Sequence, residues 1–204
     1  MKIICTGLNY VRHIEEFSNP VPENPVFFLK PETALLRKNR PFFYPDFSKN
    51  IHYEAELVLK IGKTGKSISE KFASRYIDSV GLGVDFTARD IQEKCRKNGL
   101  PWEICKSFDC SAPISSTFIP FDDFDSGAGI DFHLDINGKT VQNGNSTDLL
   151  FSFAKIISYV SQFITLKIGD LIFTGTPEGV GAVKIGDRLK GYIGQKLMLN
   201  FEVR

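Results

Sequence analysis

The chain has 204 residues, of which 42% are hydrophobic, and its formal net charge at pH 7 is +1. This length and apolar content are typical of one domain with a packed core, and the near-zero charge gives no electrostatic reason to expect a nucleic acid or a membrane surface as a partner. No apolar run approaches the roughly 18–20 residues that span a bilayer, and Gly7 breaks the N-terminal apolar stretch too early for a signal peptide.

The four cysteines, at positions 5, 95, 105 and 110, show no Cys-x-x-Cys spacing and no paired histidine. This pattern argues against a zinc site and is typical of reduced thiols. We therefore expect a cytoplasmic protein.

The N-terminal segment is predicted to form a short strand over residues 2–6, a break at residues 7–10 and a helical turn over residues 11–17. In this turn His13 and Glu16 stand three residues apart, so they share one face. A histidine held by a carboxylate is a common general base, although the spacing alone favours an ordinary charged turn. Residues 18–25 contain three prolines and are predicted to be a loop.

A pair of glutamates distinguishes the next segment. Residues 26–29 are predicted to form a buried strand that ends at Lys30, and residues 52–59 a second strand. Side chains on a strand alternate between its faces, so Glu54 and Glu56 point the same way with Cα atoms about 6.5–7 Å apart. A hard divalent cation would relieve their repulsion, but the pattern alone also fits the solvated face of an edge strand.

The residues after this strand add polar groups that could meet in one cleft. A predicted strand over residues 80–86 carries Asp85 near its end. Thr87 is expected to cap a helix over residues 88–97, on which Arg89 and Gln92 share a face. Lys106 follows among apolar residues. It is interpreted either as a lysine that reaches out to water or as a buried cation that holds an anionic substrate or enolate.

The remaining segments predict a strand-rich α+β domain without a linker. A glycine-rich loop over residues 175–181 follows a short strand, and its backbone N–H groups could bind a carboxylate. The predicted elements are a weak helix over 68–76, a strand over 130–136 with a hairpin turn at 137–138, a helix over 148–163 capped by Ser146 or Thr147, a strand over 171–174, and strands within 187–203.

Six runs of residues together resemble the fumarylacetoacetate hydrolase family, in its short acylpyruvate-hydrolase-like branch. Each run alone is weak evidence, whereas the set is specific and follows the family's order over nearly the whole chain. The runs are residues 7–10 with His13 and Glu16, 28–31, 52–57, 85–92, 99–108 and 169–181.

The resemblance implies a fold and an assembly. It implies a roll of mixed β-sheets with few helices, like the C-terminal domain of that family, with residues 1–204 as a single catalytic domain and residues 1–25 as an N-terminal strand and lid segment. It also implies a homodimer, with a small keto acid as substrate and neither nucleic acid nor membrane as a partner.

The resemblance further implies a metal site and its surroundings. Mg²⁺ (or Mn²⁺) would be bound by Glu54, Glu56 and Asp85, which agrees with the all-oxygen ligand set. The substrate would be surrounded by Arg89, Gln92, Lys106, Thr176, Gly175 and Lys30. Many family members have a basic residue where this chain has Leu8, so a contact to the substrate carboxylate is missing or supplied elsewhere.

The leading functional hypothesis is metal-dependent hydrolysis of a C–C bond in an acylpyruvate, giving a carboxylic acid and pyruvate. His13, oriented by Glu16, would activate the attacking water, and Gln92 and Lys106 would stabilise the oxyanion. The same resemblance covers oxaloacetate decarboxylation or tautomerisation and isomerisation or decarboxylation of a 2-hydroxy-dienoate from aromatic catabolism. Two other hypotheses are a non-catalytic metal-binding relative and a hydrolase that uses Cys105 or Cys110 as nucleophile.

Overall fold

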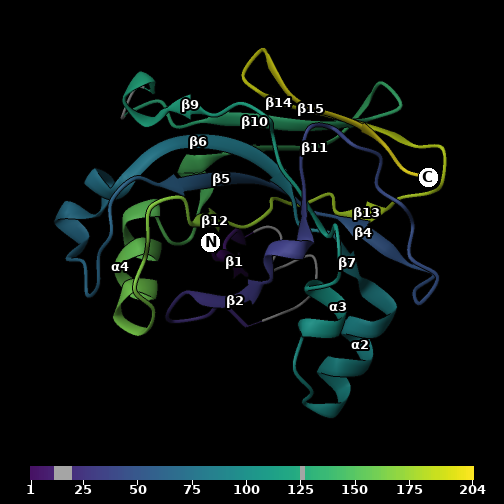
Figure 1. Cartoon of the computed structure of the whole chain (residues 1–204), viewed down its shortest axis with the longest axis horizontal. Coiled ribbons are helices and arrows are strands. Elements are labelled where there is room, and N and C mark those ends of the chain that lie inside the picture. Colours follow the sequence, from purple (N-terminus) through teal and green to yellow (C-terminus); the bar gives the residue numbers. More distant parts are fainter. Residues whose placement is uncertain (12–19, 125–126) are drawn as a thin grey trace.

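A six-stranded mixed sheet runs through the centre of the molecule (Figure 1). The computed structural model describes residues 1–11, 20–124 and 127–204. The strand order is β2-β1-β12-β5-β6-β9, in which β1 and β12 are parallel and the other neighbours are antiparallel. These strands are β1 (Ile3–Gly7), β2 (Val26–Lys30), β5 (Ala55–Ile61), β6 (Ile77–Val84), β9 (Ile119–Pro120) and β12 (Leu171–Phe173).

An antiparallel sheet of four strands covers one face of the central sheet, above β5 and β6 in Figure 1. The two sheets approach closely, because a Cβ atom on Gly191 would lie only 2.5 Å from the Leu82 side chain. Their facing apolar side chains form the main core. The four strands are β10 (Asp131–Ile136), β11 (Lys139–Asn145), β14 (Arg188–Ile193) and β15 (Lys196–Glu202).

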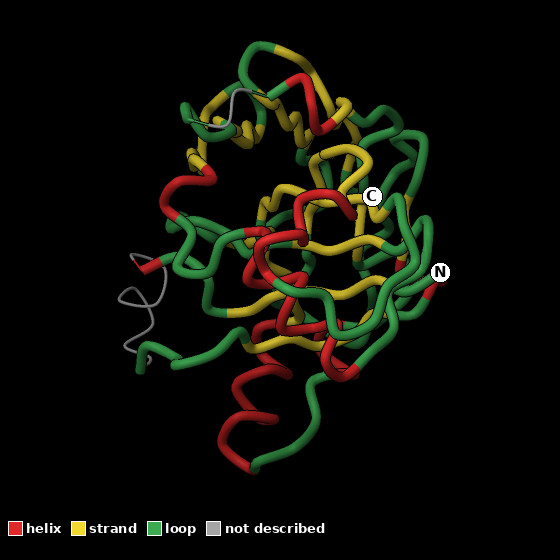
Figure 2. The backbone as a smooth tube through the Cα atoms, turned by 90° about the vertical axis from the view of Figure 1, so that its left-hand side faces the viewer, coloured by secondary structure: helices red, strands yellow, loops and turns green. Residues whose placement is uncertain are grey.

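Smaller sheets and helices complete the fold. Helices α2 and α3 lie together at one end of the molecule, away from α4 (Figure 1), and strands fill the centre in the perpendicular view of Figure 2. Within the described ranges, no helix is both long and apolar enough to cross a bilayer. The elements are β3 (Leu35–Leu36), β4 (Ile51–Tyr53), β7 (Thr87–Ala88), β8 (Ala112–Pro113), β13 (Gly181–Ala182), α2 (Arg89–Asn98), α3 (Glu103–Lys106), α4 (Phe153–Phe163) and 3-10 turns at Glu32–Ala34, Glu70–Tyr76, Phe121–Asp123 and Ser146–Asp148.

The prediction of a strand-rich α+β fold with mixed sheets and few helices is confirmed. The start of the long helix was predicted wrongly. Residues 146–148 form a 3-10 turn, and α4 begins at Phe153, where the Ser152 hydroxyl accepts a hydrogen bond of 3.2 Å from the Lys155 N–H. The Ser152 hydroxyl therefore caps the first turn of α4, and the helix begins directly after it.

Two further local predictions were wrong. Strand β2 is an edge strand, with Val26 36% and Leu29 41% exposed, because it has β1 alone as a neighbour in the sheet order. Ala88, not Thr87, is the residue at the start of α2. The Thr87 hydroxyl donates instead to Glu54 Oε1 at 3.0 Å. The Thr87 hydroxyl thus hydrogen-bonds a carboxylate that is distant in sequence, instead of capping the helix as local spacing predicts.

The predicted strand over residues 52–59 is divided at Glu54. Strand β4 belongs to a three-stranded sheet with β7 and β13, whereas β5 belongs to the central sheet. Glu54 lies between them and is buried. The junction between two sheets therefore holds a carboxylate inside the protein, so the solvated edge-strand interpretation is wrong.

A buried asparagine attaches the end of β1 to two other parts of the fold. The Asn9 amide donates to the carbonyl oxygens of Phe151 and Thr174 at 3.1 and 2.7 Å, and its Oδ1 accepts from the Phe151 N–H at 2.7 Å. The side chain is 1% exposed. These bonds hold β1, the start of α4 and the end of β12 in one arrangement.

We predict that Asn9→Asp lowers the free energy of unfolding by about 2–3 kcal/mol, because a buried carboxylate cannot donate to the two carbonyl oxygens. Urea denaturation would measure the change. Asn39→Asp is the control, since Asn39 is exposed and its Oδ1, which Asp retains, accepts from the Asn200 N–H; this change should alter stability by less than about 0.5 kcal/mol. Equal stability of the two variants would contradict this role of Asn9.

Candidate active site

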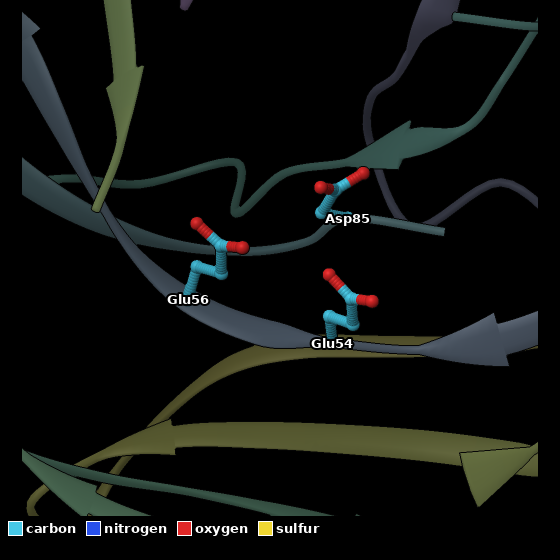
Figure 3. Close-up of side chains that lie close together, drawn as sticks. All are labelled: Glu54, Glu56 and Asp85. Carbon is cyan, nitrogen blue, oxygen red and sulfur yellow. The ribbon is translucent and has the colours of Figure 1, made fainter. Parts of the chain in front are cut away.

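Three buried carboxylates meet where β5 begins and β6 ends (Figure 3). Antiparallel pairing aligns Ala55 with Val84, and the Asp85 N–H continues the ladder by donating to the Glu54 carbonyl oxygen at 2.8 Å. One carboxylate oxygen from each of Glu54, Glu56 and Asp85 lies within 4.8 Å of the others. The register of two neighbouring strands therefore assembles the cluster that the sequence suggested.

Buried cations surround two of these carboxylates. Lys106 Nζ lies 2.7 Å from Glu54 Oε2 and 2.8 Å from Asp85 Oδ2. Arg89 contacts Glu54 Oε1 at 2.7 Å, and Lys30 Nζ contacts Asp85 Oδ1 at 2.7 Å. Three cations from three different elements thus pair with Glu54 and Asp85.

Lys106 is a buried cation and does not reach out to water, since the residue is 3% exposed. Burial acts to lower the Lys106 pKa, but the Asp85 and Glu54 carboxylates outweigh it and raise the pKa above its ordinary value. The ammonium therefore stays charged at neutral pH. It is suited to stabilise negative charge and unsuited to accept a proton.

Lys30 lies behind Asp85, and it is not among the residues that line the neighbouring cavity. Its ammonium donates to the Ser111 hydroxyl at 2.9 Å, to the carbonyl oxygens of Ser111 and Phe86 at 3.2 and 3.3 Å, and to the carbonyl oxygen of Lys106. The expected contact of Lys30 with substrate stays a prediction, which its position away from the cavity lining does not favour. The residue instead positions Asp85 and the end of α3.

Glu56 is held by backbone. Its Oε2 accepts a 2.7 Å hydrogen bond from the Gly175 N–H. Gly175 has φ +101°, and a Cβ atom there would lie 2.7 Å from the Asn9 Cβ, so only glycine suits this position. The glycine-rich loop thus uses this N–H for a carboxylate of the protein itself. Burial, and then repulsion from Asp85 and Glu54, raises the Glu56 pKa well above its ordinary value.

A cavity of about 120 Å³ opens onto the carboxylates. This volume is well below the roughly 300–1,000 Å³ of sites for drug-sized ligands, so it suits a compact substrate. Its lining includes all three carboxylates, the end of β1 (Thr6, Gly7 and Leu8), Phe28, one face of α2 (Arg89, Gln92 and Arg96), Trp102, Lys106 and Thr176.

Helix α2 presents three polar side chains to this cavity. Arg89 donates to Gln92 Oε1 at 2.6 Å, which confirms that the two residues share a face. Arg96 is exposed, and the sequence analysis missed it. Its position four residues after Gln92, one helical turn further along the same face, is the signal that could have revealed it.

Gln142 of β11 is a second residue that the sequence analysis missed. Its amide donates to Thr176 Oγ1 at 2.8 Å, and its Oε1 accepts from the Ala55 N–H at 2.9 Å. It therefore connects the four-stranded sheet with the cavity wall and with the strand of the two glutamates. No local pattern in the sequence indicates such a long-range contact.

The remaining candidates differ in their status. His13 and Glu16 lie outside the described residues, so the predicted base stays a prediction. Cys105 and Cys110 do not line the cavity. Burial, with Cys95 nearby, raises the Cys105 pKa to about 12, so this thiol stays protonated and is a poor nucleophile.

The ligand set fits a hard divalent cation. Three buried carboxylates, with no soft ligand among them, are the donors that Mg²⁺ and Mn²⁺ prefer, and such ions keep further positions for water or substrate. Glu54, Glu56 and Asp85 would hold the ion, which would act there as a Lewis acid.

Comparisons with known proteins place the chain in a family. A family model described as fumarylacetoacetate (FAA) hydrolase C-terminal matches residues 2–204. The chain is 42% identical over 202 residues to mitochondrial oxaloacetate tautomerase FAHD1 of Mus musculus, covering 99% of this chain and 91% of the relative. It is 41% identical over 189 residues to oxaloacetate tautomerase YcgM of Escherichia coli (strain K12), covering 92% and 86%.

The chain is also similar in fold to a protein of known structure. That structure is the crystal structure of fumarylpyruvate hydrolase from Pseudomonas aeruginosa in complex with Mn²⁺ and pyruvate. The TM-score is 0.92 at 38% identity, and the match covers 100% of this chain and 89% of that chain. A protein with the same fold thus binds a divalent ion together with a small keto acid.

We predict that the rise in melting temperature caused by Mn²⁺ grows as the pH increases from about 5 to 8. Because the Glu56 pKa is raised in the folded state, its contribution to stability is complete below the ordinary carboxyl pKa and is lost as the pH rises through the raised value. An ion at the ionised carboxylate would offset this loss. Thermal unfolding with Mn²⁺ and with EDTA would measure the difference.

Glu56→Gln should reduce the Mn²⁺ effect and remove most of its pH dependence. Glu23→Gln, at an exposed position, serves as the control and should behave as the unmodified protein. A Mn²⁺ effect of equal size at pH 5 and pH 8 would show that Glu56 does not lose a proton when the ion binds.

Proposed function

The chain belongs to the fumarylacetoacetate hydrolase family, and on this basis we propose that it is a divalent-metal-dependent enzyme that interconverts the keto and enol forms of oxaloacetate. The observation that carries the proposal is the buried cluster of Glu54, Glu56 and Asp85 on the wall of a small cavity. Two relatives at 41–42% identity are named oxaloacetate tautomerases. C–C hydrolysis, the leading hypothesis from the sequence, is less well supported.

The balance of charge at the site favours a dicarboxylate. Once all three carboxylates are ionised, their charge is matched by Lys30, Lys106 and Arg89, which contact Glu54 and Asp85. A divalent cation would therefore leave the site with two positive charges, and charge separated from water in a protein interior is costly. Oxaloacetate carries two negative charges at neutral pH and would restore neutrality, whereas a monocarboxylate would leave one positive charge.

From keto to enol, a proton leaves C3, negative charge develops on the C2 oxygen, and this oxygen then receives a proton; the reverse reaction moves both protons back. When bound, the ion would supply Lewis-acid stabilisation of that charge. Lys106 stays protonated beside the carboxylates and can add a second positive charge. Gln92 and Thr176, which line the cavity, are placed to hydrogen-bond substrate oxygens. His13 with Glu16 remains the proposed proton-transfer pair.

Arg96 is proposed to bind the carboxylate of oxaloacetate that lies farther from the ion. Leu8, where many family members have a basic residue, lines the cavity without charge. Arg96 approaches the same cavity from the exposed face of α2. Arginine can pair with a carboxylate through two parallel hydrogen bonds, which also fixes the orientation of the substrate.

Hydrolysis of acylpyruvates is the second candidate, and the similarity to a fumarylpyruvate hydrolase favours it. It would use the same cavity and ion site but needs a base that activates water. His13, oriented by Glu16, would take the proton from water. Gln92 and Lys106 would stabilise the oxyanion.

Assembly and compartment are also proposals. We propose a homodimer, on the family resemblance, and light scattering of the purified protein would test it. A mitochondrial location is the alternative to the expected cytoplasmic one, since the Mus musculus relative is named a mitochondrial protein. Fractionation of the native cells would distinguish the two compartments.

The test of the proposed function is a panel of substrates assayed with Mg²⁺, with Mn²⁺ and with EDTA. Loss of enol absorbance from enol-oxaloacetate, without release of pyruvate, would support the tautomerase. Metal-dependent release of pyruvate from acetylpyruvate or fumarylpyruvate would identify a hydrolase, and release from oxaloacetate a decarboxylase. Rates that are unaffected by EDTA would contradict a metal-dependent enzyme of any of these kinds.

We predict that Arg96→Ala raises the KM for oxaloacetate about tenfold with little change in kcat, because it removes one charged contact to the substrate. Arg96→Lys should retain much of the affinity. Lys97→Ala is the control on the same helix, since Lys97 is exposed and does not line the cavity. Steady-state kinetics would decide, and an unchanged KM for Arg96→Ala would exclude this contact.

We also predict that His13→Ala lowers kcat by about 10²–10⁴, as expected for loss of a general base, while Mn²⁺ binding measured by calorimetry is retained. His133→Ala is the matched control, because His133 stacks on Tyr192 at a ring-centroid distance of 4.5 Å and does not line the cavity. If His13→Ala kept its full rate, another group would have to transfer the proton.

A further inference from the structure

Thr6, near the end of β1, carries a buried hydroxyl and is one of the residues that line the cavity. The residue is 2% exposed and lines the cavity beside Gly7 and Leu8. Within the part of the chain that the structure describes, Thr6 Oγ1 has no hydrogen-bond partner. A methyl group in this position would stabilise the folded protein more than the hydroxyl does, because a hydroxyl that is buried without a hydrogen-bond partner costs free energy.

Other buried hydroxyls near the site have partners. Thr87 Oγ1 donates to Glu54 at 3.0 Å, and Thr174 Oγ1 donates to the Leu57 carbonyl oxygen at 3.1 Å. Ser111 Oγ donates to the Lys106 carbonyl oxygen at 2.9 Å. Thr6 thus differs from its neighbours, and the difference is confined to a side chain on the cavity wall.

We infer that Thr6 Oγ1 is a substrate-binding group, which hydrogen-bonds an oxygen atom of the keto acid at the β1 end of the cavity. The inference depends on the proposed function and deepens it. A threonine hydroxyl both donates and accepts, so it can serve the carbonyl or carboxylate oxygen of one tautomer and the enol hydroxyl of the other.

The cavity is asymmetric, and this asymmetry assigns Thr6 a role in orientation. Arg89, Arg96 and Lys106 all belong to α2 and α3, whereas the β1 end contributes a neutral hydroxyl and the apolar Leu8. An anionic end of the substrate is drawn toward the helices. A substrate oxygen atom that can form a hydrogen bond with the Thr6 hydroxyl fits at the end of β1. A ligand without an oxygen there leaves the hydroxyl unpaired and binds less well.

The first measurement separates a ligand-binding role from a structural one. Thr6→Val keeps the side-chain shape and removes the hydroxyl. The melting temperature of metal-free Thr6→Val should equal or exceed that of the unmodified protein. Thr174→Val, which loses an internal hydrogen bond, should melt at a lower temperature. A clear loss of stability in Thr6→Val would show that the hydroxyl serves the fold, and would overturn the inference.

The second measurement is calorimetric binding of pyruvate at saturating Mn²⁺. Thr6→Val should bind pyruvate about tenfold more weakly, and Thr6→Ser should bind nearly as well as the unmodified protein. Affinity for Mn²⁺ alone should be unchanged. Equal pyruvate affinity in Thr6→Val would overturn the inference. So would an equal loss of Mn²⁺ affinity, because the hydroxyl would then act on the ion site.

Binding is measured without turnover, so this result is independent of the reaction that the enzyme catalyses. If the unmodified protein binds pyruvate but does not convert oxaloacetate, the proposed function fails. The comparison of Thr6→Val with Thr6→Ser still decides whether the hydroxyl binds the keto acid.

Discussion

The architecture depends on the compensation of charge inside the protein. Three carboxylates lie within 4.8 Å of one another and are almost completely buried. Such a group is tolerated only when cations and hydrogen-bond donors surround it. Those cations come from β2 and, much later in the sequence, from the neighbouring helices α2 and α3, so the ion pairs also fix where the two helices sit against the central sheet. The same contacts that stabilise the fold thus shape the cavity.

Much of this arrangement could be predicted from short-range patterns. The period of two along a strand placed Glu54 and Glu56 on one face, and helical spacing placed Arg89 beside Gln92. The division of the strand at Glu54 could not be predicted, because it results from pairing of residues 51–53 with β7 and β13. The identity of the partner strands depends on tertiary structure, and no local spacing encodes it.

Two of the residues that the sequence analysis missed share a physical reason, whereas Arg96 lies on a helix, where spacing could have revealed it. Thr6 and Gln142 are polar residues in strands, and their role depends on whether a partner lies opposite them in a neighbouring sheet. Lys30 was expected to contact the substrate. Its ammonium contacts Asp85 instead, and the sequence around a lysine does not show on which side of a carboxylate its ammonium will lie. Sequence identified the kinds of group at this site, and the three-dimensional packing determined which of them face the cavity.

The neutrality of the cluster has a consequence for how the enzyme is made. Many metalloproteins need their ion to fold, because their ligands would otherwise repel one another. Here Lys30, Arg89 and Lys106 already pair with Glu54 and Asp85, and the raised pKa lets Glu56 keep its proton, so folding does not have to wait for an ion. If the proposed ion binds, the chain would fold first and acquire it afterwards. The composition of the cellular metal pool would then determine which divalent ion the site carries.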